Sequence, residues 1–338
     1  MMNNNLLITG ASGFIGSHLV EEALQQGFEV FAGIRPSSSK QFLQDNRIHF
    51  VELDFSSPVL LKEQLSAFKQ LHGGFSYVIH NAGITRANSK MDFHTVNCGY
   101  TQNLADALDA SAMPLQKFVL ISSLAAYGPG NPVSFAPVET GQAQTPISAY
   151  GKSKSCAEEN IRSTSNFPYL IINPTAVYGP RDKDFLQFVK LLQSGFEPYI
   201  GTNKQMVSMI YVKDLARAVI SLLKSSSVNT SYIVSDGKAY NKEELGNILK
   251  LLLHKKTIKL KIPALPVHLV IAVIEWMQQL FTNTLPFLNT EKVKEISSAN
   301  WLCDSSALWN ELSSTPHYSL EAGMKETVEW YQQNHWLE

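Results

Sequence analysis

The stretch from Gly10 to Gly16 (GASGFIG) constrains the fold more than any other part of this chain. It follows a short apolar run at residues 5–9, typical of a buried strand, and it leads into a helical pattern at residues 17–26. Glycines in such a unit allow a tight turn, close approach of the backbone to a pyrophosphate and close helix packing. The phosphate charge then lies at the helix N-terminus. We therefore predict dinucleotide binding here, with a purely structural glycine turn as the alternative. The predicted contacts are Gly10, Ser12, Gly13, Phe14, Ile15 and Gly16.

Strand and helix patterns alternate through the rest of the first two thirds of the chain. Further strands are expected at residues 28–34, 48–53, 77–80, 118–121, 169–172 and 231–234. This alternation predicts right-handed crossovers and an α/β fold, a doubly wound parallel sheet of about seven strands. We expect residues 1–173, with 212–238 returning to them, to form the dinucleotide-binding domain. Residues 174–211 and 239–338 are expected to form a smaller, mostly helical substrate lobe.

The end of the second predicted strand indicates which dinucleotide is bound. An acidic residue at this place would hold the ribose hydroxyls, and none is present. Arg35 and Lys40 flank three serines there instead, and cations with hydroxyls suit a ribose 2′-phosphate. We therefore expect NADP(H), with NAD(H) as the alternative cofactor, unless the segment is an ordinary solvated loop.

Two later strand ends supply further predicted cofactor contacts. Asp54 follows the third strand, where its carboxylate can accept from an adenine amino group, and Phe55 comes next. Ala82 and Gly83 follow the fourth strand, where small residues let a ribose lie against the backbone. His80 is expected to pack at the end of that strand rather than to act in catalysis.

Tyr150 and Lys154 are the candidate proton-transfer pair. If they share a helix, their spacing puts both side chains on one face, with the ammonium toward the phenol. A phenol has a pKa of about 10, and a neighbouring positive charge favours its ionised form. A spacing this short also arises by chance, roughly once in a chain of this composition. An exposed helix with a solvated lysine is the alternative interpretation.

Polar residues elsewhere are candidates for the same site. Ser122 and Ser123 close the fifth strand, and ligands of open α/β sheets bind beyond the carboxyl ends of the strands. Asn97 lies in a long helical pattern at residues 93–111, where it either orients groups near the nicotinamide or satisfies helix backbone. Residues 124–147 are rich in Gly, Pro and small polar residues, which predicts a long loop covering the site.

Composition excludes several kinds of partner. Twenty-eight basic and twenty-nine acidic residues leave no net field to hold nucleic acid or an anionic membrane, so we expect a small-molecule substrate. Residues 262–288 are interrupted by polar side chains, which predicts an amphipathic helix rather than a membrane span. The N-terminus shows no export signal, so a cytoplasmic location is expected.

The cysteines fit the same location. Cys98, Cys156 and Cys303 are odd in number and far apart, which predicts neither a disulfide framework nor a cysteine zinc site. No set of His, Cys, Asp and Glu shows metal-ligand spacing along the chain. We therefore predict a reduced protein without a metal.

Taken together, the motifs resemble a known family. The glycine turn, Ser123, the YGKSK stretch from Tyr150 to Lys154, and NPTAVYGP at residues 173–180 occur in order at domain-scale spacing. They resemble the extended short-chain dehydrogenase/reductase family, which includes nucleotide-sugar epimerases and dehydratases, 3β-hydroxysteroid dehydrogenases and dihydroflavonol reductases. The resemblance covers nearly the whole chain.

The resemblance implies a role for each matching residue. Tyr150 would be the general acid and base, and Lys154 would hold the nicotinamide ribose and lower the phenol pKa. Ser123 would hold the substrate oxygen, with Ser122 as its weaker rival, and Asn97 would be the asparagine of the active-site helix.

The family also implies how the cofactor lies and how subunits pair. Asp54 would bind adenine, and Pro174 would lie where the chain passes the nicotinamide. The helices that hold Asn97 and Tyr150 would pair two subunits into a homodimer, the commonest soluble assembly.

Two departures favour one branch of the family. Asn173 stands where many epimerases have arginine, and the second strand lacks the acidic residue of NAD-bound epimerases. Residues 301–304 and 320–331 are similar to tails of hydroxysteroid dehydrogenases and flavonol reductases. We therefore expect an oxidoreductase acting on a carbonyl or secondary alcohol. An NAD(P)-dependent nucleotide-sugar epimerase or dehydratase and a non-catalytic dinucleotide sensor are the alternatives. The substrate-contact candidates are Arg86, Tyr178 and Arg181.

Overall fold

Seven parallel strands form the central sheet, in the order β11-β6-β5-β4-β1-β2-β3. The computed structural model describes residues 4–87, 89–201, 204–263, 266–267, 270–271 and 290–337. The strands are β1 (Asn5–Thr9), β2 (Glu29–Ile34), β3 (His49–Glu52), β4 (Tyr77–His80), β5 (Lys117–Ile121), β6 (Tyr169–Pro174) and β11 (Thr230–Val234). The predicted doubly wound sheet is confirmed, including the late return of its seventh strand.

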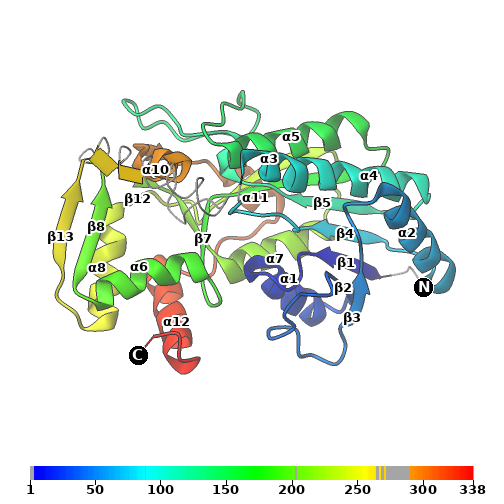
Figure 1. Cartoon of the computed structure of the whole chain (residues 1–338), viewed down its shortest axis with the longest axis horizontal. Helices are drawn as coiled ribbons and strands as arrows, with labels where there is room; N and C mark the ends of the chain where they lie inside the picture. Colours follow the sequence, from blue (N-terminus) through cyan, green and yellow to red (C-terminus); the bar gives the residue numbers. More distant parts are fainter. Residues whose placement is uncertain are drawn as a thin grey trace.

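Helices cover both faces of this sheet (Figure 1). One face carries α2 (Pro58–His72), α4 (Tyr100–Ala110) and α5 (Ala149–Thr164); the other carries α1 (Phe14–Gln25), α7 (Val212–Leu223) and α11 (Ser306–Glu311). Successive strand residues point to opposite faces, so Leu7 packs in one core while Leu6 and Ile8 pack in the other. A parallel sheet covered on both sides needs strands that are largely apolar, and the central strands β1, β4, β5 and β6 fit this, whereas β3 at the edge is largely exposed.

The strand order reverses at β1, which pairs with β2 on one side and β4 on the other. The chain proceeds from β1 through β2 to β3 in one direction, and from β4 through β5 to β6 in the other. Loops after β1 and β4 therefore diverge, and ligands of open α/β sheets bind in the crevice at such a switch point.

The remaining elements lie beside this sheet (Figure 1, left), and several of them enclose a separate apolar core. They include the pair β7 (Ala176–Tyr178) and β10 (Met209–Tyr211), the pair β8 (Phe196–Ile200) and β13 (Ile258–Ile262), and the triplet β12 (Tyr240–Asn241), β9 (Met206–Val207) and β14 (Asn300–Trp301). The helices are α6 (Lys183–Gln193), α8 (Lys242–Leu253), α10 (Thr290–Ser297) and α12 (Leu320–Gln333).

The late part of the chain is mostly helical in its described residues, as predicted, but it also contains short strands. Strands β12, β13 and β14 all fall in the stretch expected to be mostly helical, where they pair with the earlier strands β8 and β9. Most of the amphipathic helix predicted for 262–288 lies outside the described residues. Within the described ranges, none of the helices has the length and apolar character needed to cross a bilayer.

Candidate active site

The glycine turn packs so closely that side chains are excluded from it. A Cβ on Gly10, which has a φ of +64°, would lie 2.8 Å from the Ala82 nitrogen, and one on Gly16 would lie 2.1 Å from the Gly10 oxygen. Helix α1 begins after Gly13 and, in the part of the chain that is described, has neither a side-chain cap nor an acidic residue in its first turn. The positive end of α1 therefore faces the crevice, which suits a pyrophosphate.

His80 at the end of β4 organises the neighbouring turn. The Thr9 hydroxyl accepts from the backbone amides of residues 81 and 82 at 3.2 and 3.1 Å, so it donates to His80 Nδ1 at 2.8 Å. The Thr101 hydroxyl donates to the Asn97 carbonyl at 2.7 Å, so it accepts from His80 Nε2 at 3.1 Å. Burial lowers the pKa of His80 to about 3. His80 is thus a neutral residue packed at a strand end, as predicted.

Asn97 joins the loop after β4 to helix α5. The long helix predicted for 93–111 is α3 (Lys90–Phe93), the π-helical segment η1 (His94–Gly99) and α4. From η1, the Asn97 amide accepts from the Ile84 nitrogen at 2.8 Å and donates to the Ile84 oxygen and the Ser153 hydroxyl, both at 3.0 Å. Its partners are on other segments, so Asn97 positions the loop that carries Gly83 rather than capping its own helix.

Ser123, Tyr150 and Lys154 meet at the carboxyl end of β5. Helix α5 begins at Ala149, and the preceding Ser148 caps it by accepting from the Gly151 nitrogen at 3.0 Å. Lys154 is only 7% exposed, and its ammonium donates to the Ile121 carbonyl at 2.9 Å. The Ser123 side chain lies near enough to the Tyr150 phenol to oppose the rise in its pKa. Three residues predicted from separate motifs are thereby brought together.

Burial dominates the electrostatics of Tyr150 and Lys154. Burial raises the pKa of Tyr150 to about 12, the Ser123 side chain opposes that shift, and Glu295 of α10 adds to it. Burial also lowers the pKa of Lys154 to about 8, opposed by Glu158. Desolvation of the phenolate is the largest influence on the Tyr150 pKa, and Lys154 is not among its other causes. The lowering by Lys154 stays a prediction, and the phenol is protonated at neutral pH.

Glu158 is a member of the site that the sequence analysis missed. It lies in α5, four residues after Lys154, and is fully buried. Its carboxylate accepts from Gln144 at 2.6 Å, from Arg162 at 2.9 Å, and from the Ser122 hydroxyl. Tyr150, Lys154 and Glu158 are spaced by four residues, which places all three on one face of a helix. This spacing could have predicted Glu158 as a member of the site.

Asn173 links this carboxylate to Ser123. Its amide donates to Glu158 at 2.5 Å and to the Ser123 carbonyl at 3.2 Å. Ser122 is buried and donates to Glu158, whereas Ser123 is half-buried and contacts Tyr150. This arrangement favours Ser123 over its rival Ser122.

The predicted phosphate contacts lie on the loop after β2. Arg35 is exposed, and its backbone nitrogen donates to the Ser38 hydroxyl at 3.0 Å, which turns the chain directly after the strand. The Lys40 ammonium lies 4.1 Å from the centre of the Phe50 ring, so it is turned toward β3.

The predicted contacts Asp54, Phe55 and Pro174 lie at the ends of two strands, β3 and β6. Asp54 accepts from the Ser56 hydroxyl at 2.5 Å and from its nitrogen at 2.9 Å, and these hydrogen bonds lower the Asp54 pKa. The Phe55 ring lies 5.8 Å from that of His80. Pro174 ends β6 and is buried.

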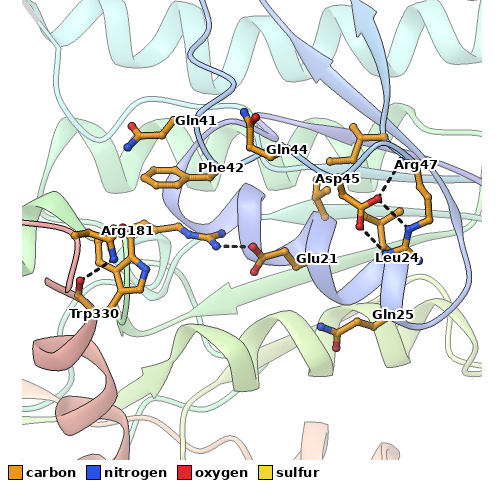
Figure 2. A pocket seen from close by; sticks show the side chains of 13 residues that line it. Glu21, Leu24, Gln25, Gln41, Phe42, Gln44, Asp45, Arg47, Arg181 and Trp330 are labelled. Carbon is orange, nitrogen blue, oxygen red and sulfur yellow. Dashed lines mark hydrogen bonds and ion pairs between the residues drawn. The ribbon is translucent and has the colours of Figure 1, made fainter.

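The substrate-contact candidates have other partners. Arg86 is paired with Asp184, and Tyr178 is buried with its ring 5.5 Å from that of Tyr211. Arg181 is paired with Glu21 and lines a hollow of about 430 Å³ between α1, residues 41–48 and α12 (Figure 2). Of the described residues that line this hollow, none is a predicted cofactor or catalytic residue.

The cysteine prediction is wrong in one respect. Cys98 of η1 and Cys156 of α5 are joined as a disulfide, and only Cys303 is free among the cysteines. The two lie 58 residues apart in sequence, and packing of η1 against α5 brings them together. His94 lies beside them, so a His-Cys-Cys set exists in space that has no signature in the sequence.

This fold and crevice define a dinucleotide-binding enzyme of the extended short-chain type. The chain belongs to the NAD dependent epimerase/dehydratase family, whose model matches residues 6–235. It is 26% identical over 333 residues to ceramide reductase of Caulobacter vibrioides, covering 98% of this chain and 95% of the relative. It is 25% identical over 346 residues to UDP-glucose 4-epimerase of Vibrio cholerae, covering 98% and 97%.

Solved structures confirm the fold. The dTDP-glucose 4,6-dehydratase of Streptomyces venezuelae, with NAD and TYD bound, superposes with a TM-score of 0.78 at 21% identity, covering 99% of each chain. UDP-glucuronic acid 4-epimerase of Bacillus cereus, in complex with NAD, gives 0.76 at 20% identity, covering 98% of this chain and 99% of the other. Relatives therefore include both reductases and epimerases, as the main and alternative predictions require.

Proposed function

We propose that this protein is an NADP(H)-dependent oxidoreductase that interconverts a carbonyl and a secondary alcohol. The observation that carries the proposal is the placing of Tyr150 and the buried Lys154 on one turn of α5, beside Ser123 at the carboxyl end of β5. Reductases among the relatives support net redox: the ceramide reductase, and a ketoreductase of Stigmatella aurantiaca that is 23% identical over 265 residues. Asn173 in place of arginine and the missing acidic residue after β2 weigh against the sugar-epimerase alternative.

Each residue has a defined task in this proposal. A nicotinamide cofactor held by the glycine turn, Asp54, Phe55 and the 82–83 turn would supply or accept the hydride. Ser123 donates a hydrogen bond to the substrate oxygen, and Tyr150 delivers its proton to that oxygen during reduction. Because the Tyr150 pKa is about 12, the phenol is fully protonated at neutral pH, which favours the reductive direction there.

Lys154 is placed to hold the cofactor ribose. A Cβ on Gly83 would lie 3.5 Å from the Lys154 ammonium and 2.9 Å from the Asn97 amide oxygen. Gly83 thus has no side chain beside the Lys154 ammonium, so a ribose lying on the 82–83 turn would be next to that ammonium. Asn97 fixes the turn through Ile84 and is a positioning residue.

The preference for NADP(H) rests on Arg35. No acidic residue between residues 30 and 40 repels a 2′-phosphate, and Arg35 follows β2 directly. A charge-assisted hydrogen bond contributes about 1.5–3 kcal/mol, so one such contact gives on the order of a ten- to hundredfold preference.

Fluorescence titration of NADPH and NADH tests this preference. We expect tighter NADPH binding in the wild type and loss of the difference in Arg35→Ala. The matched control is Arg47→Ala, an exposed arginine on the same loop that is paired with Asp45 and should leave the preference unchanged. Equal or tighter binding of NADH by the wild type would refute the assignment.

A second experiment separates net redox from internal epimerisation. An oxidoreductase must exchange its cofactor, whereas an epimerase regenerates it and can retain it. We expect dialysis to remove the cofactor, and NADPH oxidation to follow addition of ketones with long apolar chains, a panel suggested by the ceramide and farnesyl groups in the reductases' names. Cofactor retained through dialysis, with interconversion of UDP-sugars and no net NADPH consumption, would establish the epimerase instead.

The assembly and location remain part of the proposal. The helices holding Asn97 and Tyr150 would pair two cytoplasmic subunits, and residues 1–173 with 212–238 would bind the cofactor while 174–211 and 239–338 bind the substrate. Light scattering that gives a monomer mass at micromolar concentration would contradict the dimer.

A further inference from the structure

Three potential metal ligands converge where η1 packs on α5, outside the crevice described above. His94 and Cys98 lie one turn apart on η1, and Cys156 reaches them from α5. The Cys156 sulfur lies 3.8 Å from His94 Nε2, and one ligand atom from each of the three residues lies within 4.8 Å of the others.

These donors match one class of cation. Two thiolates and a neutral imidazole are the ligands that tetrahedral Zn²⁺ prefers, with bonds of about 2.3 Å to sulfur and 2.0 Å to nitrogen. Such bonds place neighbouring ligand atoms roughly 3.5–3.8 Å apart, close to the sulfur–imidazole separation seen here. The two sulfurs are joined in this structure, so their separation would have to increase for both to bind one ion.

The surroundings support a thiolate at Cys98 and access for an ion. The Asn160 amide donates to the Cys98 sulfur at 3.2 Å, a hydrogen bond that stabilises negative charge on sulfur and orients it. His94 is exposed, Cys156 is partly exposed and Cys98 is buried. In a single subunit, an ion would therefore enter past His94 and meet an oriented sulfur beneath it.

We propose that His94, Cys98 and Cys156 form a redox-gated Zn²⁺ site. Oxidation closes it, because the disulfide sulfurs are not thiolate donors. A dithiol reductant opens it by giving two electrons and two protons to the disulfide and becoming a disulfide itself. Zn²⁺ then displaces the two thiol protons and binds two sulfurs and His94 Nε2, with water in the fourth position. In a reducing compartment the open form predominates.

Metal titration of the full chain tests the site without any enzyme assay. Protein reduced with a phosphine and stripped by a chelator is titrated with Zn²⁺ against a chromogenic chelator, and with Co²⁺ in the near-ultraviolet. We expect one ion per chain and a thiolate-to-cobalt charge-transfer band. Oxidised protein, with two fewer reactive thiols, should show neither.

Variants assign the ligands. Cys98→Ser and Cys156→Ser should abolish stoichiometric binding, and Asn160→Ala should weaken it about 10- to 100-fold. Cys303→Ser is the matched control, since Cys303 is free, buried and in a different core, and it should bind as the wild type does.

Two results would overturn the proposal. One is a reduced wild type that binds no stoichiometric Zn²⁺, which would leave the pair a disulfide only. The other is a His94→Ala protein with unchanged Zn²⁺ affinity and Co²⁺ spectrum. His94 is exposed, so that variant folds even if a cysteine variant does not.

Discussion

Two fully buried carboxylates, Glu158 and Glu197, satisfy the same physical requirement in different parts of the molecule. Each is ion-paired with a partly buried cation, Arg162 or Lys250 respectively. Each also accepts hydrogen bonds from neutral side chains, as a buried charge must. The neutral partners are Ser122, Gln144 and Asn173 for Glu158, and Tyr199 and Thr257 for Glu197.

The two carboxylates differ in the residues that surround them. Glu158 lies one helical turn from Lys154, whose pKa it raises, and reaches Ser123 through Asn173. Glu197 ties β8 to α8 and to Thr257, directly before β13, and among its described hydrogen-bond partners none is a predicted site residue. The same arrangement thus satisfies a buried charge in both places, and only Glu158 also lies beside the proposed proton-transfer residues.

The largest expected effect separates the tyrosines of the two regions. Tyr150→Phe should lower kcat roughly 10²–10⁴-fold on a substrate found in the ketone panel, because it removes the proton donor while leaving the fold intact. Tyr199→Phe removes a hydrogen bond to Glu197 and should lower the free energy of unfolding by about 1.5–3 kcal/mol with kcat unchanged. Steady-state kinetics and denaturant unfolding measure both. A Tyr150→Phe protein that keeps a tenth of wild-type kcat would remove Tyr150 from its role.

The next effect should be shared by both carboxylates. Glu158→Gln and Glu197→Gln each replace a charged acceptor with a weaker, partly mismatched one, so each should lower the free energy of unfolding by on the order of 1–3 kcal/mol. Urea unfolding with an unchanged slope would show a stability effect in both. If either variant were as stable as the wild type, the network around that carboxylate would be dispensable.

The smallest effect is a shift in pH dependence, and only one variant should show it. Lys154 is protonated below its pKa of about 8, so kcat/KM for reduction should be level below that pH and fall above it as the ammonium is lost. Removing the Glu158 charge lowers the Lys154 pKa further, which moves the alkaline limb to lower pH in Glu158→Gln. Glu197→Gln should keep the wild-type profile. Identical limbs in all three proteins would show that the Glu158 charge does not control the alkaline limb through Lys154.

The sheet and the central site were predictable because local pattern carries them. Short apolar strands between helical runs specify a parallel sheet, and Tyr150 and Lys154 share a helix face whatever else the chain does. Ser123 was readable because a residue that closes a strand must lie at the carboxyl edge.

Other features depend on contacts between distant segments. The Cys98–Cys156 link needs η1 to lie against α5, and cysteine pairing cannot be deduced from spacing. The raised pKa of Tyr150 depends on how deeply the phenol is buried and on the charge of Glu295, which is distant in sequence. Neither can be deduced from the residues around Tyr150. By contrast, β13 could have been predicted from the sequence. Ile258–Ile262 (IKLKI) alternates apolar and basic residues with the period of a strand.

The pairing of β6 with β11 has a consequence for synthesis on the ribosome. The chain leaves the sheet at Pro174 and returns at Thr230, and Val234 then pairs beside Pro174. About 55 residues separate the two strands, and translating them takes on the order of 3–11 s at typical elongation rates. During that time β6 is an uncovered edge of the nascent sheet. An apolar edge strand is a template for pairing with another chain. Slow translation between the two strands should therefore favour aggregation of the nascent protein more than an equal delay before Tyr169. Truncation between the two strands should favour aggregation for the same reason.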